Sequence, residues 1–89
     1  MGFKQIKIYY ENKTLKAIGS YEKVLGLGNP YNVNRIGEWK FYYENGQLNE
    51  IGSYNKGKTG EWKAYHENGQ LSSIGNYRGD ARYDEWKYY

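Results

Sequence analysis

The chain has 89 residues and no cysteine, so it supports one small domain without disulfide bridges or thiolate metal sites. Thirteen basic and ten acidic residues give a net charge of +3, and the two signs alternate along the sequence instead of forming blocks. A continuous basic track for nucleic acid or a polybasic cluster for a membrane is therefore not expected. With 12 Tyr, 3 Trp and 2 Phe, any core is expected to be aromatic.

The N-terminal segment shows no targeting signal. Residues 1–6 lack the apolar core of a secretory signal, and Ile6 occupies the place where a myristoylation signal requires Ser or Thr. We therefore expect a soluble protein in the cytoplasm.

A 23-residue repeat organises the chain. The string Gly-Glu-Trp-Lys-Phe-Tyr-Tyr-Glu-Asn-Gly-Gln-Leu at 37–48 recurs at 60–71 with two changes, and Ile-Gly-x-Tyr at 51–54 recurs at 74–77. A degenerate first copy has Ile6 in the Trp position, and a last copy begins at Trp86. Within a single domain, 1–89, we assign repeat 1 to about 3–24, an insertion loop to about 25–36, repeat 2 to 37–59, repeat 3 to 60–82 and a closing half-repeat to 83–89.

Each repeat is predicted to be a β-hairpin. Asn45-Gly46 lies between two runs of aromatic and branched residues, which favours a two-residue type I′ turn with positive φ at both positions. Counting outward, Tyr43 faces Leu48 and Trp39 faces Gly52, while Trp62 faces Gly75 and Ile6 faces Gly19. A glycine weakens a strand unless something approaches it closely, so we expect the facing Trp ring to lie over it. Lys13 replaces the turn glycine in the first copy.

Stacked hairpins predict two ladders of side chains, because residues alternate between the faces of a strand. One ladder contains Ile6, Trp39, Trp62 and Trp86, with Leu15, Leu48 and Leu71 on its face. The other contains Tyr9, Tyr42, Tyr65 and Tyr89, with Ile18, Ile51 and Ile74. The fold class is therefore all-β, with stacked β-hairpins.

Three features that suggest chemistry have simpler structural interpretations. Residues 52–59 match the letters of a phosphate-binding loop, but a strand and not the required helix is expected to follow. His66 stands where the other copies have Tyr, with no nucleophile or second histidine placed beside it. Glu11, Glu44 and Glu67 lie at solvated turn entries, where a row of surface charges is a simpler interpretation than an acid pair. We assign no catalytic, cofactor-binding or metal-binding residue.

The repeated string followed by Ile-Gly-x-Tyr resembles the MORN repeat, in the bacterial variant found in antitoxins of the YwqK type. The resemblance is close over 37–79, weaker over 3–21 and partial over 83–89. It implies an elongated, twisted, single-layer antiparallel sheet with one hairpin per repeat, which gives about seven strands here. It also implies partner binding without chemistry of its own.

We therefore expect a non-enzymatic protein-binding module of the antitoxin or immunity type, which sequesters a bacterial or phage-related effector without a cofactor. Tyr and Trp often dominate protein interfaces, and one aromatic ladder should stay partly exposed. The predicted contact residues are Tyr9, Tyr42, Tyr65, Tyr89, Lys40 and Lys63 on the Tyr face and Tyr31, Asn32 and Arg35 in and beside the insertion. The alternative is a structural protein that oligomerises through its sheet ends, or that binds lipid or nucleic acid.

Overall fold

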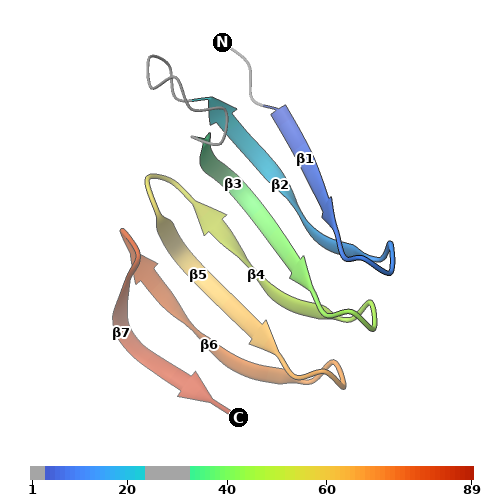
Figure 1. Cartoon of the computed structure of the whole chain (residues 1–89). Helices are drawn as coiled ribbons and strands as arrows, with labels where there is room; N and C mark the ends of the chain where they lie inside the picture. Colours follow the sequence, from blue (N-terminus) through green and yellow to red (C-terminus); the bar gives the residue numbers. More distant parts are fainter. Residues whose placement is uncertain (1–3, 24–32) are drawn as a thin grey trace.

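A computed structural model describes residues 4–23 and 33–89, which form one antiparallel sheet of seven strands in chain order (Figure 1). The strands are β1 (Lys4–Tyr9), β2 (Leu15–Lys23), β3 (Val33–Tyr42), β4 (Leu48–Tyr54), β5 (Lys58–Tyr65), β6 (Leu71–Arg78) and β7 (Ala81–Tyr88). The predicted all-β sheet of stacked hairpins is confirmed. The described part of the chain contains no helix that could cross a membrane.

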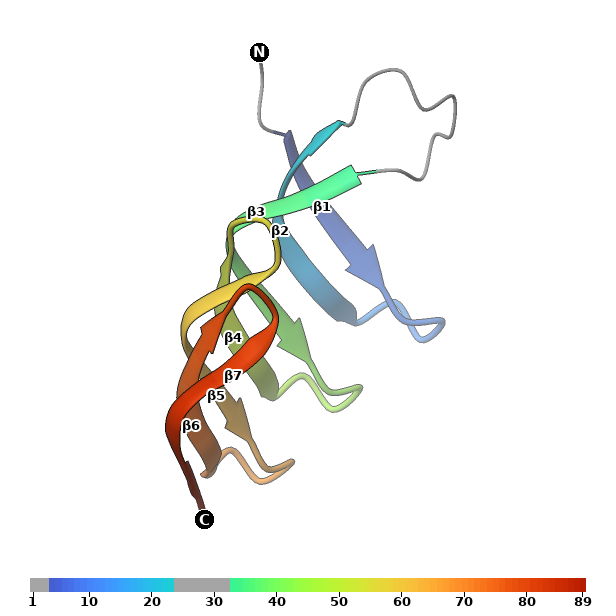
Figure 2. The same ribbon diagram turned by 90° about the vertical axis from the view of Figure 1, so that its left-hand side faces the viewer.

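The sheet is curved, and both rows of turns project toward the same side (Figure 2). That concave side faces the viewer in Figure 1. The tryptophans of β3, β5 and β7 share one face of the sheet, and the deep burial of two of them assigns that face to the concave side. Trp39 and Trp62 are each only 2% exposed, although a single sheet offers no second layer to cover them. Their burial follows from the curvature and from the side chains of neighbouring strands.

A bulge interrupts the pairing wherever one hairpin meets the next. Gly19 of β2 faces three residues of β3, 37–39, because the pairing steps from Ile18 with Lys40 to Ser20 with Ile36. The same step places 60–62 opposite Gly52 and 84–86 opposite Gly75. The first residue of each bulge has a left-handed backbone: φ is +67° at Gly37, +70° at Gly60 and +63° at Asp84. Such bulges bend a strand and re-aim its side chains.

The predicted pairing of Trp with Gly is confirmed, but the predicted contact is wrong. Trp39 pairs with Gly52 in its own hairpin, yet its ring lies over Gly19 of the preceding hairpin, where an added Cβ would stand 2.1 Å from Cδ2. The Trp62 ring covers Gly52 and the Trp86 ring covers Gly75 in the same way. The bulge directs each ring across the joint between hairpins, so every covered glycine is a contact between repeats.

The turns also differ from the predicted type I′ geometry. Gly46 N donates to Tyr43 O and Tyr43 N donates to Gln47 O, which makes a three-residue loop, 44–46. Within that loop only Gly46 has positive φ, +89°, as in a turn followed by a glycine bulge. Asn45 stabilises the turn through its side chain and not through a positive φ: its Oδ1 accepts a hydrogen bond from the N–H of Gln47 at 2.9 Å.

This turn geometry shifts the facing residues by one position. Leu48 pairs with Tyr42 and not with Tyr43, and Leu15 and Leu71 pair with Tyr9 and Tyr65. The three leucines are thus register partners of the tyrosine ladder, contrary to the prediction.

The predicted end of the insertion loop at about residue 36 is wrong, because β3 already begins at Val33. Residues 33–36 pair with β2 and belong to the sheet. The rest of the predicted insertion, 25–32, lies outside the described residues.

We expect Gly52→Ala to destabilise the protein by about 2 kcal/mol, because the new methyl group meets the Trp62 ring 2.0 Å away and overpacks the joint. Without that ring, alanine would favour a strand over glycine. Urea unfolding measures the change, with Ser53→Ala in the next position as the control. Equal stability of the two variants would contradict the joint contact.

Lys13→Gly should stabilise the protein by about 1 kcal/mol, because Lys13 holds φ at +72° in the position that Gly46 and Gly69 occupy in the other repeats. Thermal unfolding tests this, and Gly46→Lys is the reciprocal variant, expected to lose a similar amount. A lower melting temperature for Lys13→Gly would show that the first turn is not strained.

Candidate binding faces

An aromatic row crosses the concave face from β3 to β7. Successive ring centroids lie 6.3 Å apart for Trp39 and Tyr54, 5.3 Å for Tyr54 and Trp62, 6.0 Å for Trp62 and Tyr77, and 5.1 Å for Tyr77 and Trp86. All four contacts are edge to face, the favoured geometry for aromatic pairs. Sequence reasoning missed Tyr54 and Tyr77 as members, although each follows its glycine by two residues and must share its face.

The indole nitrogens of this row bind backbone across the same joints. Trp39 Nε1 donates to Ser20 O at 2.8 Å, Trp62 Nε1 to Ser53 O at 3.1 Å and Trp86 Nε1 to Asn76 O at 3.1 Å. Each acceptor directly follows the glycine that the ring covers. A tryptophan thus contributes both apolar contact and a satisfied donor to the joint.

One cation per repeat lies over this aromatic row. Each cation lies over the tryptophan four residues further along the chain. The distances from the cationic atom to the ring centroid are 5.0 Å for Arg35 Cζ and Trp39, 4.7 Å for Lys58 Nζ and Trp62, and 4.7 Å for Arg82 Cζ and Trp86. A second set of rings flanks them: Tyr54 at 5.5 Å, Tyr77 at 5.0 Å and Tyr88 at 5.8 Å. These distances are those of cation–π contacts.

The convex face carries a different row, in which lysine and isoleucine alternate across all seven strands. Register pairs place Lys7, Ile18, Lys40, Ile51, Lys63, Ile74 and Lys87 side by side. The long lysine stems can cover the isoleucines while the ammonium groups stay in water. Lys63 Nζ lies 3.8 Å from Glu61 Oε1, an exposed pair of small energetic weight.

The structure separates the contact residues predicted from the sequence. Tyr9, Tyr42, Tyr65, Lys40 and Lys63 lie in the convex half of the alternation, with Tyr9 55% exposed and the other four half-buried. Arg35 lies on the concave face over Trp39. Tyr89, 66% exposed, follows β7. Tyr31 and Asn32 lie outside the described residues.

The turn entries bind each hairpin to the next. Tyr10 OH donates to Tyr42 O and Tyr43 OH donates to Tyr65 O, both at 2.6 Å, and His66 Nε2 lies 3.1 Å from Tyr89 O. His66 thus occupies the place of the tyrosines in the other repeats. The backbone carbonyls of Glu44 and Glu67 accept from Thr14 and Asn45.

Residues 52–59 form the end of β4, a turn and the start of β5, in which Asn55 N donates to Gly57 O. The structure confirms that a strand follows this segment, so it lacks the helix whose amino end holds phosphate in a phosphate-binding loop.

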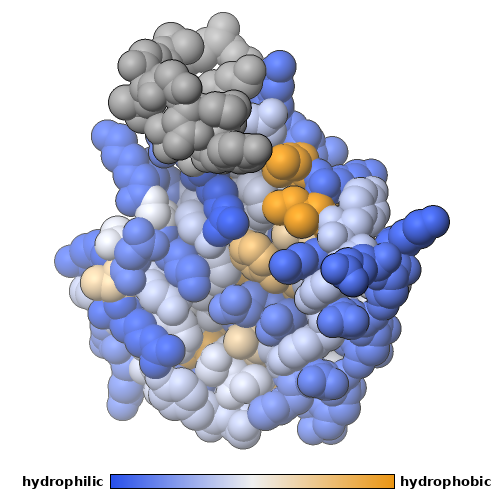
Figure 3. Space-filling model, viewed as in Figure 1, coloured by the Kyte–Doolittle hydropathy of each residue, from blue (hydrophilic) through white to orange (hydrophobic). Residues whose placement is uncertain are grey.

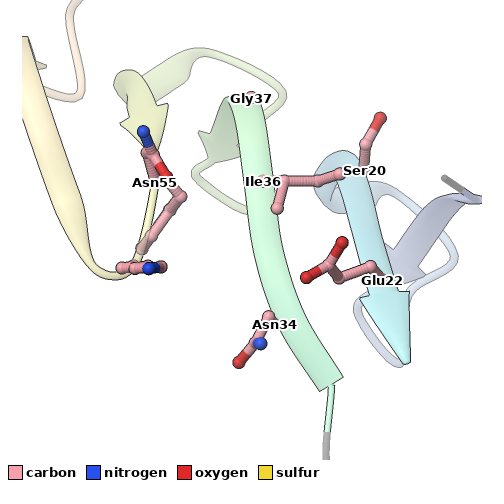
Figure 4. Close-up of a pocket in the computed structure, with 8 residues that line it drawn as sticks. Ser20, Glu22, Asn34, Ile36, Gly37 and Asn55 are labelled. Atoms are coloured by element: carbon pink, nitrogen blue, oxygen red, sulfur yellow. The ribbon is translucent and has the colours of Figure 1, made fainter. Parts of the chain in front are cut away.

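A groove of about 730 Å³ lies between the upper ends of β2 and β3 and the turn after β4 (Figure 4). Ser20 and Glu22 reach it from β2, Asn34 and Ile36 from β3, and Asn55 from the turn. Glu22 is the only carboxylate among its described lining residues, so these supply no pair of carboxylates for acid–base catalysis. Among residues 4–23 and 33–89, no cluster of three His, Asp or Glu side chains could hold a metal ion.

A single-layer sheet of hairpins joined by repeating Trp-on-Gly contacts defines a β-repeat protein of the solenoid-like kind. Comparison with protein families gives one match, the MORN repeat variant, over residues 5–23, 35–56 and 58–78. These segments cover more than half of the chain, which therefore belongs to the MORN repeat variant family. No curated protein and no solved structure matches. Repeats of this family are generally non-catalytic modules that bind protein or lipid.

Tyr43→Phe should cost about 1 kcal/mol of unfolding free energy, because it removes the hydrogen bond to Tyr65 O and leaves that carbonyl without this partner. Tyr9→Phe is the matched control, since Tyr9 is largely exposed and its hydroxyl meets no partner within the described part of the chain. Chemical unfolding of both variants measures the difference. An equal loss of unfolding free energy in the two variants would show that the Tyr43 hydrogen bond does not stabilise the contact between repeats.

Proposed function

We propose that this chain is a protein-binding repeat module that acts as an inhibitor of the antitoxin or immunity type, sequestering one effector protein in the cytoplasm. The observation that carries the proposal is the single layer itself. Within the described residues no second layer covers either face of the seven-stranded sheet, and no cluster of His, Asp and Glu side chains there could hold a metal ion. The antitoxin assignment is drawn from the sequence resemblance to YwqK-type proteins.

The joints between hairpins support a binding role because they hold the two faces in a fixed shape. Rings, indole donors and turn hydroxyls fix each hairpin against the next. A surface that is ordered before binding loses less conformational entropy when a partner docks. Among the predicted contact residues, Tyr9 and the convex lysines extend this surface on one side.

Affinity capture from the source organism tests the proposal. We expect the tagged chain to retain one protein in stoichiometric amount, and that protein's activity to fall when the chain is added. The variant Tyr9→Ser/Lys40→Gln/Lys63→Gln tests whether the convex face makes the contact, and should weaken capture if it does. Recovery of lipid or nucleic acid alone, with no protein partner, would contradict the proposal.

Association through the sheet ends remains the second candidate, because β1 and β7 each have only one neighbour within the described sheet. An unpaired strand edge can add a strand from another chain. Sedimentation over a concentration series is expected to show oligomers if this role holds, and a monomer at all concentrations would exclude it.

A further inference from the structure

The cations of the concave face form a periodic row that no feature of the fold itself requires. Arg35, Lys58 and Arg82 come from β3, β5 and β7, one per repeat and each four residues before its tryptophan. The position four residues before the tryptophan is occupied by arginine twice and by lysine once, so positive charge is the property that the three side chains share. Figure 3, which views the concave face, shows hydrophilic side chains across much of it and hydrophobic ones gathered over β1 and β2.

No carboxylate forms an ion pair with this row within the described residues. The one ion pair there is that of Lys63 with Glu61, on the convex face. Asp80, near Lys58, uses Oδ1 to accept the backbone N–H of Lys58 at 2.8 Å, and it forms no ion pair with the ammonium group. Glu50, which pairs with Ala64, lies four residues from Tyr54 on the same face, roughly 13 Å along the strand. The row is therefore left with aromatic rings as its partners.

The rings hold the two guanidinium groups in place and leave their edges available. Arg35 Nη1 donates to the Tyr54 hydroxyl at 3.3 Å, and Arg82 Nη1 donates to the Tyr88 hydroxyl. A guanidinium has five N–H donors in one plane, so these single bonds leave most of the donors for a ligand. Paired N–H donors of this kind match a carboxylate.

The spacing of the row selects a shape of ligand. Successive cations are two strands apart, roughly 10 Å given the ordinary spacing between strands. A polyproline II segment has three residues per turn and rises about 3.1 Å per residue, so every third side chain returns to the same side after about 9.3 Å. In a β-strand, by contrast, third neighbours point to opposite sides.

We propose that the concave face binds an extended acidic segment of the partner protein, in polyproline II conformation, with a carboxylate at every third position. The proposal rests on the protein-binding function above and adds the chemistry of the bound segment. Each carboxylate meets one of Arg35, Lys58 and Arg82.

The geometry favours a peptide over the other anionic polymers. A flat bilayer cannot follow a concave sheet whose turns project on both sides of the row. Single-stranded nucleic acid needs exposed ring faces on which bases stack, whereas Trp39 and Trp62 are 2% exposed. A single extended peptide is narrow enough to enter the concave face, and its carboxylates can bind the cations without any exposed ring face.

Two synthetic peptides of equal composition test the proposal by calorimetry at low salt. Both contain three Asp among Pro and Ala; one has Asp at every third position and the other has the three Asp adjacent. We expect the spaced peptide to bind at least tenfold more tightly. The variant Arg35→Gln/Lys58→Gln/Arg82→Gln should abolish that binding.

The matched control is Lys7→Gln/Lys40→Gln/Lys87→Gln, which removes the same charge from the convex face and should change binding less than threefold. Near-UV circular dichroism of the tryptophans verifies that both triple variants are folded. Should the concave triple variant unfold, the single variants are compared instead, each expected to weaken binding about tenfold.

Equal affinity for the two peptides, or equal loss in the two triple variants, would overturn the proposal. So would tighter binding of phosphatidylserine vesicles or oligothymidylate with the same dependence on the concave cations. If the concave variant captures the native partner as well as the unmodified chain does, this inference fails while the proposed function stands. If the chain captures no protein but binds the spaced peptide specifically, the proposed function fails and the ligand chemistry of the face stands.

Discussion

The contact of one tryptophan ring with one glycine of the preceding hairpin is the constraint on which this structure depends. A single sheet has no second layer, so its apolar burial must come from within the sheet. The bulge at 37–39 and its two counterparts aim each ring back across the joint, and the glycine lets the ring approach the backbone. The indole N–H then donates a hydrogen bond to the backbone carbonyl of the residue that follows the glycine. The bulges that aim the rings also bend the strands, and the bent sheet buries the rings.

The same contact prepares the surfaces that a partner can use. Because the rings are directed to one side, the concave face becomes a row of edge-to-face aromatics with cations above it. The convex face is left with lysines and isoleucines in alternation. The two faces therefore differ in chemistry although one short repeat encodes both. A partner that contacts this sheet meets either a row of lysines and isoleucines or an ordered row of cations that form no ion pair among the described residues.

The period, the hairpins and the pairing of Trp39 with Gly52 could all be predicted from the sequence, because turn residues and strand alternation are local signals. The ring contact could not, since counting within a hairpin cannot show that a bulge sends Trp62 to the neighbouring Gly52. Nothing in the sequence around Gly37 distinguishes a bulge from the ordinary start of a strand. Arg35 is predicted as a contact residue but assigned to the insertion, whereas it lies in β3, which extends beyond the bulge. Lys58 and Arg82 are not predicted as contact residues, because counting within a hairpin does not show that β5 and β7 also extend beyond their bulges.

A double-mutant cycle on Gly52 tests the central contact most directly. It compares the cost of Gly52→Ala by urea unfolding in three backgrounds: the unmodified chain, Trp62→Val and Trp39→Val. The Trp62 ring covers Gly52, so the loss of stability from Gly52→Ala should disappear in the Trp62→Val background. Trp39 only pairs with Gly52 in the sheet, so the loss should persist in the Trp39→Val background. A cost that disappears with Trp39→Val, or that is the same in all three backgrounds, would contradict the account.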